Sequence, residues 1–318
     1  MKKLLAILCV LAMILALTAC GDKAKDKYKV GICQLAPHDA LDAASQGFMD
    51  ALKDELGEGN VEFDYQNAAG DSATCTTIVN AFVADGVDLI MANATAALQA
   101  AVAGTDTIPV LGTSITEYGV ALDLDNFNGT VGGNVSGTSD LAPLAEQAAM
   151  IKEWFPDAQN VGLLYCSAES NSLYQVKTVA AALKDLGMNC TEYPFTDSND
   201  LAAICQEAAS SCDVMYIPTD NTAASSTEIV DGIFRPAGIP IIAGEESICA
   251  GCGVATLSID YYDLGYATGK MAAKILTGKA DISQMPIEYA PNFTKKYNAA
   301  ICEALNLTAP EGYVAIGE

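Results

Sequence analysis

The chain has 318 residues, of which 40 are Asp or Glu and 16 are Lys or Arg, so its formal net charge is −24. A surface this acidic repels nucleic acid, and it also argues against a protein that grips anionic lipid through basic residues. A chain of this length exceeds what one hydrophobic core usually organises, so we expect two lobes. With 51% hydrophobic residues, both lobes can be well packed.

The first twenty residues predict export. A positively charged start precedes an almost wholly apolar run from Leu4 to Leu17, and Leu17-Thr18-Ala19-Cys20 follows. The run is shorter than the ~20 residues that cross a bilayer, which disfavours the alternative of a short membrane anchor. The pattern resembles a lipobox, which implies a lipoprotein signal peptide over 1–19 and a lipid on Cys20. We therefore expect a polar, lipid-anchored tether over 20–27 and a location on the extracytoplasmic face of the cell membrane.

Beyond the tether, short apolar runs alternate with amphipathic stretches. This βαβα order predicts an α/β fold with a mostly parallel sheet and helices on both faces. The expected strands form two series, 28–33, 61–66, 87–92 and 108–112, then 160–165, 189–194, 213–217, 239–243 and 254–258.

The two series are built on one plan, because three pairs of segments match in residue type and in order. Chance similarity between strands rich in Val and Ile is the alternative, but the matching order favours internal duplication. The paired segments are 86–97 with 212–224, 107–113 with 238–244, and 29–33 with 160–164.

Hydroxyl-rich turns follow the expected strands. In open α/β sheets, ligands bind outside the carboxyl ends of the strands, where helix N-termini offer free backbone N–H groups. Ser, Thr, Asp and Asn are also preferred helix caps, so each single residue is explained by capping alone. The gathering of such turns in both halves favours a binding cleft between two facing lobes. The turns are 34–38, 93–95, 113–116, 167–172, 219–222 and 244–247.

The residue patterns that catalysis or a cofactor would need are not convincing. His38 is the one histidine, no Gly-x-Ser-x-Gly or Gly-x-Gly-x-x-Gly motif occurs, and Gly265 to Lys270 is one residue short of a phosphate-binding loop. Cys249 and Cys252 could form a redox dithiol or half of a metal site, but a local disulfide or two plain thiols are favoured. We therefore predict a binding protein without catalytic residues, metal or cofactor.

Several segments carry a family resemblance. They are 30–34 with 38–44, Gly133-Asn-Val-Ser-Gly-Thr-Ser-Asp140, Pro218-Thr-Asp-Asn-Thr222, and 259–265 running into 268–273. Together they resemble ABC-transporter substrate-binding lipoproteins of the tryptophan/tyrosine-binding type, over nearly the whole mature chain.

The resemblance implies a type I periplasmic-binding-protein fold, with two Rossmann-like lobes and three crossovers between them. The crossovers are expected near Gly137, Ser258 and Tyr289. The N-terminal lobe would then comprise 28–137 plus 259–288, and the C-terminal lobe 138–258 plus 289–318.

The resemblance also implies an amino-acid ligand, an ABC permease and its ATPase. A buried ammonium needs carboxylate or carbonyl oxygens, and a buried carboxylate needs N–H or hydroxyl donors. Asp220, assisted by Glu245, is our first choice for the ammonium. Candidates for the remaining contacts are Gln34, His38, Thr95, Thr113, Ser114, Asn171, Ser172 and Thr219, with His38, Tyr118 and Tyr174 as possible stacking partners of an aromatic ring.

Two segments depart from the family pattern beside the expected pocket. Thr116-Glu117-Tyr118 stands where Thr-Asp-Pro is often found, and 247–253 contains unexpected cysteines and glycines.

The alternatives that stay open are a branched-chain amino acid, a nucleoside or a sugar as ligand, a lipid-anchored sensory ectodomain, or a surface enzyme.

Overall fold

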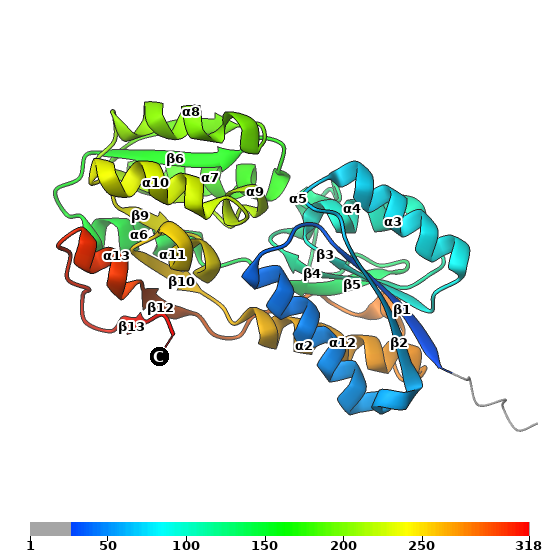
Figure 1. Ribbon diagram of the computed structural model, residues 1–318. Coiled ribbons are helices and arrows are strands. Elements are labelled where there is room, and N and C mark those ends of the chain that lie inside the picture. The colour runs from blue at the N-terminus through cyan, green and yellow to red at the C-terminus, as the bar shows by residue number, and fades with distance from the viewer. Residues whose placement is uncertain (1–26, 318) are drawn as a thin grey trace, which may run out of the picture.

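The computed structural model describes residues 27–317 and consists of two α/β lobes side by side (Figure 1). The first lobe contains a sheet of six strands in the order β11-β5-β4-β3-β1-β2, and every neighbouring pair is parallel. Its strands are β1 (Tyr28–Gln34), β2 (Val61–Asn67), β3 (Leu89–Asn93), β4 (Val110–Ile115), β5 (Val135–Ser139) and β11 (Glu288–Tyr289).

The second lobe repeats this order in a sheet of seven strands, β13-β12-β10-β9-β8-β6-β7. Strand β12 runs antiparallel to β10, and the other neighbours are parallel. The strands are β6 (Asn160–Cys166), β7 (Asn189–Phe195), β8 (Val214–Ile217), β9 (Ile241–Ala243), β10 (Ala255–Ser258), β12 (Thr294–Tyr297) and β13 (Val314–Ala315).

Helices cover both faces of each sheet. Those of the first lobe are α2 (Asp39–Leu56), α3 (Ser72–Asp85), α4 (Thr95–Gly104), α5 (Tyr118–Ala121) and α12 (Tyr261–Leu276), with short 3₁₀ turns η1 (Glu58–Asn60) and η2 (Ile282–Gln284). Those of the second lobe are α6 (Leu144–Trp154), α7 (Ser170–Asp185), α8 (Ser198–Ala209), α9 (Asn221–Ala224), α10 (Thr227–Ala237), α11 (Glu246–Cys252) and α13 (Ala299–Ala304).

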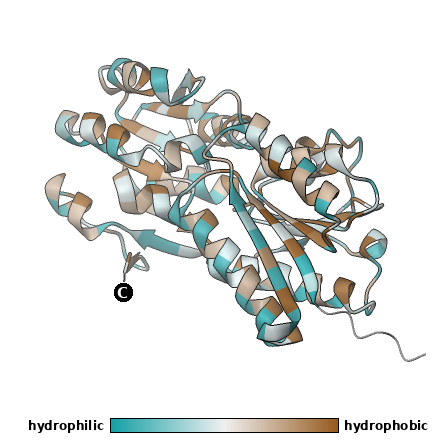
Figure 2. Ribbon diagram, turned by 45° about the vertical axis from the view of Figure 1, so that its right-hand side comes forward, coloured by the Kyte–Doolittle hydropathy of each residue, from teal (hydrophilic) through white to brown (hydrophobic). Residues whose placement is uncertain are grey.

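The predicted two-lobed fold is confirmed, and each of the nine predicted strands is present within three residues of its expected bounds. The strands not predicted are β5, β11, β12 and β13. Strand β5 consists of small and hydroxyl residues after its first valine, and β12 is largely hydrophilic (Figure 2), so neither has the apolar run that marks a strand.

The chain passes between the lobes three times. It leaves the first sheet after β5, returns between β10 and α12, and leaves again between β11 and β12. Gly137 lies inside β5, so the first connection begins after Ser139. The residue-level lobe boundaries given above remain a prediction.

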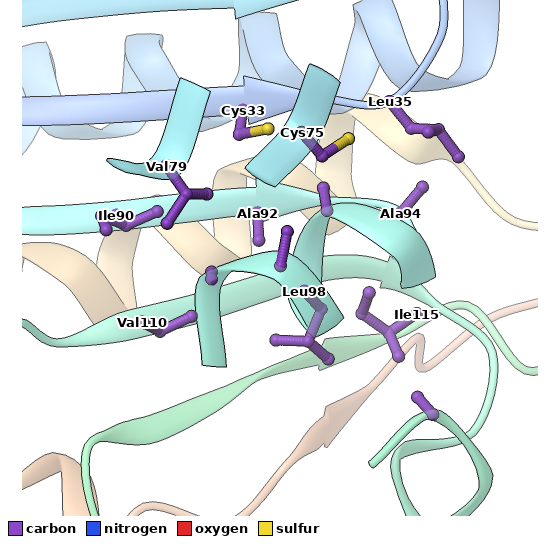
Figure 3. Packing of buried hydrophobic residues seen from close by; sticks show 14 of the residues in the cluster. Cys33, Leu35, Cys75, Val79, Ile90, Ala92, Ala94, Leu98, Val110 and Ile115 are labelled. Atoms are coloured by element: carbon purple, nitrogen blue, oxygen red, sulfur yellow. The ribbon is translucent and has the colours of Figure 1, made fainter. Parts of the chain in front are cut away.

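Each lobe has its own apolar core between sheet and helices. Figure 3 shows part of the first, where Cys33 of β1 and Cys75 of α3 lie side by side among Val79, Ile90 and Leu98. Helices α2 and α12 can pack closely because Gly265 has no Cβ. A Cβ at this position would clash with the backbone of Ala44. Gly265 and its neighbours therefore serve helix packing, as expected for a segment that is not a phosphate loop.

The expected signal peptide, the lipidation site Cys20 and the tether up to residue 26 lie outside the described residues. Within residues 27–317, no helix combines the length and the apolar character that crossing a membrane requires.

Candidate functional site

A small cavity lies where the two lobes meet. Its volume is about 10 Å³, which is room for about one water molecule. Its walls come from the end of β4, from turns after β1, β4 and β5 of the first sheet, from turns after β8 and β9 of the second, and from the starts of α2, α7, α9 and α12. The lining residues are His38, Ala40, Leu41, Ser114, Thr116, Asp140, Asn171, Thr219, Asp220, Asn221, Ala224, Glu245 and Tyr261.

Six of the ten predicted site residues line this cavity, namely His38, Ser114, Asn171, Thr219, Asp220 and Glu245. They come from both lobes, although the first and last are more than two hundred positions apart in the sequence. The parallel strands bring them together because their carboxyl ends face the same gap.

Three buried polar atoms around the cavity have no hydrogen-bond partner within residues 27–317: His38 Nδ1, Ser114 Oγ and Asp140 Oδ1. Leaving a buried polar atom unpaired costs about 1–3 kcal/mol, and folded proteins contain few such atoms. Three of them at one small cavity indicate a site arranged for a polar ligand.

Asp140 follows directly after β5 and is 4% exposed. Its Oδ2 accepts a hydrogen bond of 2.9 Å from the Tyr261 hydroxyl. Burial raises the pKa of the Asp140 carboxyl to about 6, although the neighbouring hydroxyl groups of Tyr261 and Thr116 oppose this rise. The residue is therefore largely ionised at neutral pH, and one of its oxygens is free to accept.

Asp220 is also buried, but both of its oxygens are occupied. Oδ1 caps α9 by accepting the Ala223 N–H at 2.8 Å, and Oδ2 accepts the Cys166 N–H at 2.7 Å. Burial and the nearby negative charge of Glu169 raise the pKa of the Asp220 carboxyl to about 8. At neutral pH this group is mostly protonated, and the bonds that it makes are those of a structural cap.

Glu245 has the same structural role at α11. Its Oε1 accepts from the Ile248 N–H at 2.8 Å and from the Ser247 hydroxyl at 2.6 Å, while Oε2 accepts the Ser247 N–H at 2.6 Å. The carboxylate therefore satisfies the first turn of its own helix.

Ser114 and His38 occupy the first-lobe wall. Ser114 has φ +55°, a left-handed conformation that is costly for a residue other than glycine. His38 reaches across the gap, where its Nε2 lies 3.3 Å from Oδ1 of Asn221. Strained backbone and unpaired polar atoms often occur together at functional sites.

Four predicted site residues lie away from the cavity wall. Gln34 forms hydrogen bonds with Ser45, Asp42 and the Ala36 carbonyl. Thr113 forms hydrogen bonds with Thr138 and Thr268. Ser172 accepts a hydrogen bond from Asn171, and Thr95 is the first residue of α4.

Of the predicted stacking partners, His38 alone is on the wall of this cavity. Tyr118 is fully buried, donates its hydroxyl to the Thr138 carbonyl and stacks on Phe127. Tyr174 packs at the edge of the second lobe's core.

Four lining residues with polar side chains were not predicted: Thr116, Asp140, Asn221 and Tyr261. Three of them stand in segments that carry the family resemblance, and Thr116 and Asn221 lie in turns expected to face the cleft, but none of the four was assigned a ligand contact. Asp140 could have been found by treating 135–139 as a strand, since it then becomes the first residue beyond a carboxyl end.

A second, larger space of about 360 Å³ adjoins this cavity and shares Asn221 with it. Leu35, Ala36 and Pro37 from the first lobe face Cys166, Glu169 and Thr222 from the second across it. It lies within the range of volumes that hold small ligands in proteins.

The nine cysteines of the described chain are all free thiols, including Cys249 and Cys252 on α11. Among the described residues no group of three or more His, Cys, Asp or Glu side chains is placed to hold a metal ion.

Comparison with known proteins places this geometry in context. A family model described as "ABC transporter substrate binding protein" matches residues 29–316. The tyrosine-binding protein of Clostridioides difficile (strain R20291) is 35% identical over 268 residues, which is 83% of this chain and 76% of that protein.

Two solved structures are similar over 91% of this chain. An ABC domain from Streptococcus pneumonia in complex with L-Trp has 31% identity and a TM-score of 0.86, with all of that chain covered. A ligand-free, open substrate-binding protein from Clostridium difficile has 35% identity but a TM-score of 0.69, with 99% of that chain covered. Over its whole length the present structure is therefore more similar to the first of these two structures than to the second.

Proposed function

Since this chain belongs to the family of ABC transporter substrate-binding proteins, we propose that it binds an aromatic amino acid between its lobes and delivers it to a permease with a separate ATPase. Tryptophan, tyrosine and phenylalanine are the proposed ligands. The protein acts on the extracytoplasmic face of the membrane, held there by the lipid on Cys20. Recognition of the solute, without chemical change to it, is its task.

The observation that carries the proposal is the cavity between the lobes, where unpaired polar atoms from His38, Ser114 and Asp140 converge. A zwitterion supplies both a donor and an acceptor group to such a site. Ligand names among the relatives support the aromatic class, because one is a tyrosine-binding protein and another is bound to L-Trp.

An aromatic amino acid is far larger than the 10 Å³ of the cavity. Binding therefore requires the lobes to separate and to close again around the ligand. The adjoining space beyond Asn221 provides room for the aromatic ring once the contact between His38 and Asn221 opens.

A thermal-shift screen of the purified protein in detergent tests this proposal. A ligand at 100 times its dissociation constant adds about 2.7 kcal/mol to stability, so a true ligand is easily seen. We expect stabilisation by tryptophan, tyrosine or phenylalanine. Stabilisation by a sugar, a nucleoside or a branched-chain amino acid alone would contradict the aromatic specificity, and recovery of a chemically altered compound would contradict a pure binding role.

A further inference from the structure

We propose that Asp140, rather than Asp220 or Glu245, is the carboxylate that pairs with the ammonium group of the amino-acid ligand. This assignment rests on the proposed function and goes beyond it by naming the atoms that recognise the ligand's backbone. Ser114 and His38 complete this polar subsite by donating to the ligand's carboxylate.

The three acids at the cavity differ in how many oxygens are available. Asp220 and Glu245 each accept backbone N–H groups with both oxygens, and these bonds hold the first turns of α9 and α11 and tie Asp220 to the end of β6. Asp140 caps no helix, and its Oδ1 is buried without a partner. An ammonium at Asp220 or Glu245 would meet oxygens that already accept hydrogen bonds, whereas at Asp140 it would pair an oxygen that has no partner.

The charge balance of the cavity also favours an incoming cation. Among its lining residues, all of which lie in the described part of the chain, there is no Lys or Arg, while three have carboxyl groups, of which Asp220 is mostly protonated. Asp140 is 4% exposed, so its negative charge is poorly hydrated. A ligand ammonium would replace the missing hydration with a charge-assisted hydrogen bond.

Tyr261 orients the Asp140 carboxylate. It opens α12, on the connection between the second and the first sheet, and donates to Oδ2 at 2.9 Å. This bond turns one oxygen toward the connection and leaves Oδ1 as the acceptor. Because the bond joins two segments that link the lobes, the position of the ammonium partner is tied to the hinge.

The donors for the ligand's carboxylate stand on the same first-lobe wall. The Ser114 hydroxyl is 6% exposed and unpaired, and the unusual φ of the residue holds it at the end of β4. In the shut arrangement Nε2 of His38 donates to Oδ1 of Asn221, and the unpaired Nδ1 becomes a second donor when this contact opens and the proton moves to Nδ1. A donor pair and an acceptor on one wall match the two ends of an amino-acid backbone.

Calorimetric titration of the full-length protein tests the assignment. The probes are L-tyrosine and L-tryptophan, together with the desamino analogues hydroxyphenylpropionate and indolepropionate, which lack the amine. The variants are Asp140→Asn and, as matched controls, Asp220→Asn and Glu245→Gln. In Asp140→Asn the side-chain oxygen can still accept from Tyr261, so the local fold is retained.

We expect wild-type protein to bind the amino acids about a hundredfold more tightly than the desamino analogues, because an unpaired buried carboxylate is costly. Asp140→Asn should abolish this preference, and the two control variants should retain it. If Asp140→Asn keeps the preference while one of the controls loses it, the assignment is wrong.

Two further outcomes separate the assignment from the proposed function. If wild-type protein binds the desamino analogues as tightly as the amino acids, the ammonium has no carboxylate partner and the assignment fails although aromatic binding stands. If wild-type protein binds none of the aromatic compounds, the proposed function itself fails, and the assignment with it.

Discussion

The two lobes share one strand order but use the acids and turns at their facing edges differently. In the second lobe, Glu169, Asp220 and Glu245 stand at the starts of α7, α9 and α11, and each carboxylate accepts backbone N–H groups. In the first lobe, the residues before α2 and α4 are His38 and Ala94, and neither makes a side-chain cap bond.

The backbone of the first lobe is also strained at this edge. Ala94 has φ +85° and Ser114 has φ +55°, although neither is a glycine. These three carboxylates of the second lobe thus bond within its own turns, while His38, Ser114 and Asp140 each leave a polar atom unpaired beside the gap. The comparison teaches that the same kind of turn residue is structural where its bonds are complete and available to a ligand where they are not.

The largest expected effect comes from breaking a completed turn. Glu169 accepts five hydrogen bonds, including the backbone N–H groups of Asn221 and Thr222. Glu169→Ala should lower the free energy of unfolding by about 3 kcal/mol in denaturant titration, because these donors lose their acceptor. The exposed Glu303→Ala is the control and should stay within about 0.5 kcal/mol. Equal losses in both variants would show that the turn does not depend on Glu169.

The second-largest loss of stability is expected for Asp220→Asn. An amide presents one oxygen to two N–H donors, so about 2 kcal/mol of unfolding free energy should be lost. The raised pKa of about 8 means that the folded state holds this proton more tightly than the unfolded state. Its contribution to stability therefore falls as the pH rises from about 4 to 8. The free energy of unfolding should differ less between pH 5 and pH 8 in Asp220→Asn than in the wild-type protein. An equal difference in both proteins would contradict the raised pKa.

Binding itself should depend on pH through Asp140. With its pKa at about 6, the carboxyl takes up a proton as the pH falls from 7 to 5, and the ligand ammonium loses its partner. The dissociation constant should rise about tenfold over this interval. Tyr261, Thr116 and Glu245 act on Asp140, and His38 and Asp220 line the same cavity, so Asp140→Asn is the needed reference. A pH dependence that persists in this variant would assign the effect to another group.

The smallest effect on stability is expected at Ser114. Ser114→Gly relieves a left-handed backbone that costs a non-glycine residue about 1–2 kcal/mol, and it adds the entropy cost of glycine, about 0.5–1 kcal/mol. The net gain in unfolding free energy should be about 0.5 kcal/mol, while amino-acid binding weakens because the hydroxyl is lost. Unchanged binding by calorimetry would remove Ser114 from the polar subsite.

How far the sequence could predict the fold depended on the strength of the apolar pattern. The nine strands with Val- or Ile-rich runs were found, because period and composition agreed there. Strand β5 was taken for a crossover, since Gly, Ser and Thr dominate it and its strand identity comes from pairing with β4 and β11. Tertiary pairing of this kind leaves no local signal.

For the site, the sequence located the right turns but did not resolve neighbouring residues within them. Thr113 is in β4 and bonds to Thr138 and Thr268, whereas the next residue, Ser114, turns into the cavity. The direction of each side chain depends on backbone angles that composition does not reveal. Whether an acid such as Asp220 is occupied by a cap depends in turn on donors from segments distant in sequence, such as Cys166.

The contact between His38 and Asn221 closes a cavity too small for any amino acid. Molecules in this shut arrangement and molecules that hold an amino acid are therefore competing populations. The measured affinity equals the intrinsic affinity multiplied by the fraction of molecules that are open. A substitution that weakens the shut form, such as Asn221→Ala, acts on that fraction, so ligand uptake at low concentration is set by the equilibrium between the lobes as well as by the contacts to the ligand.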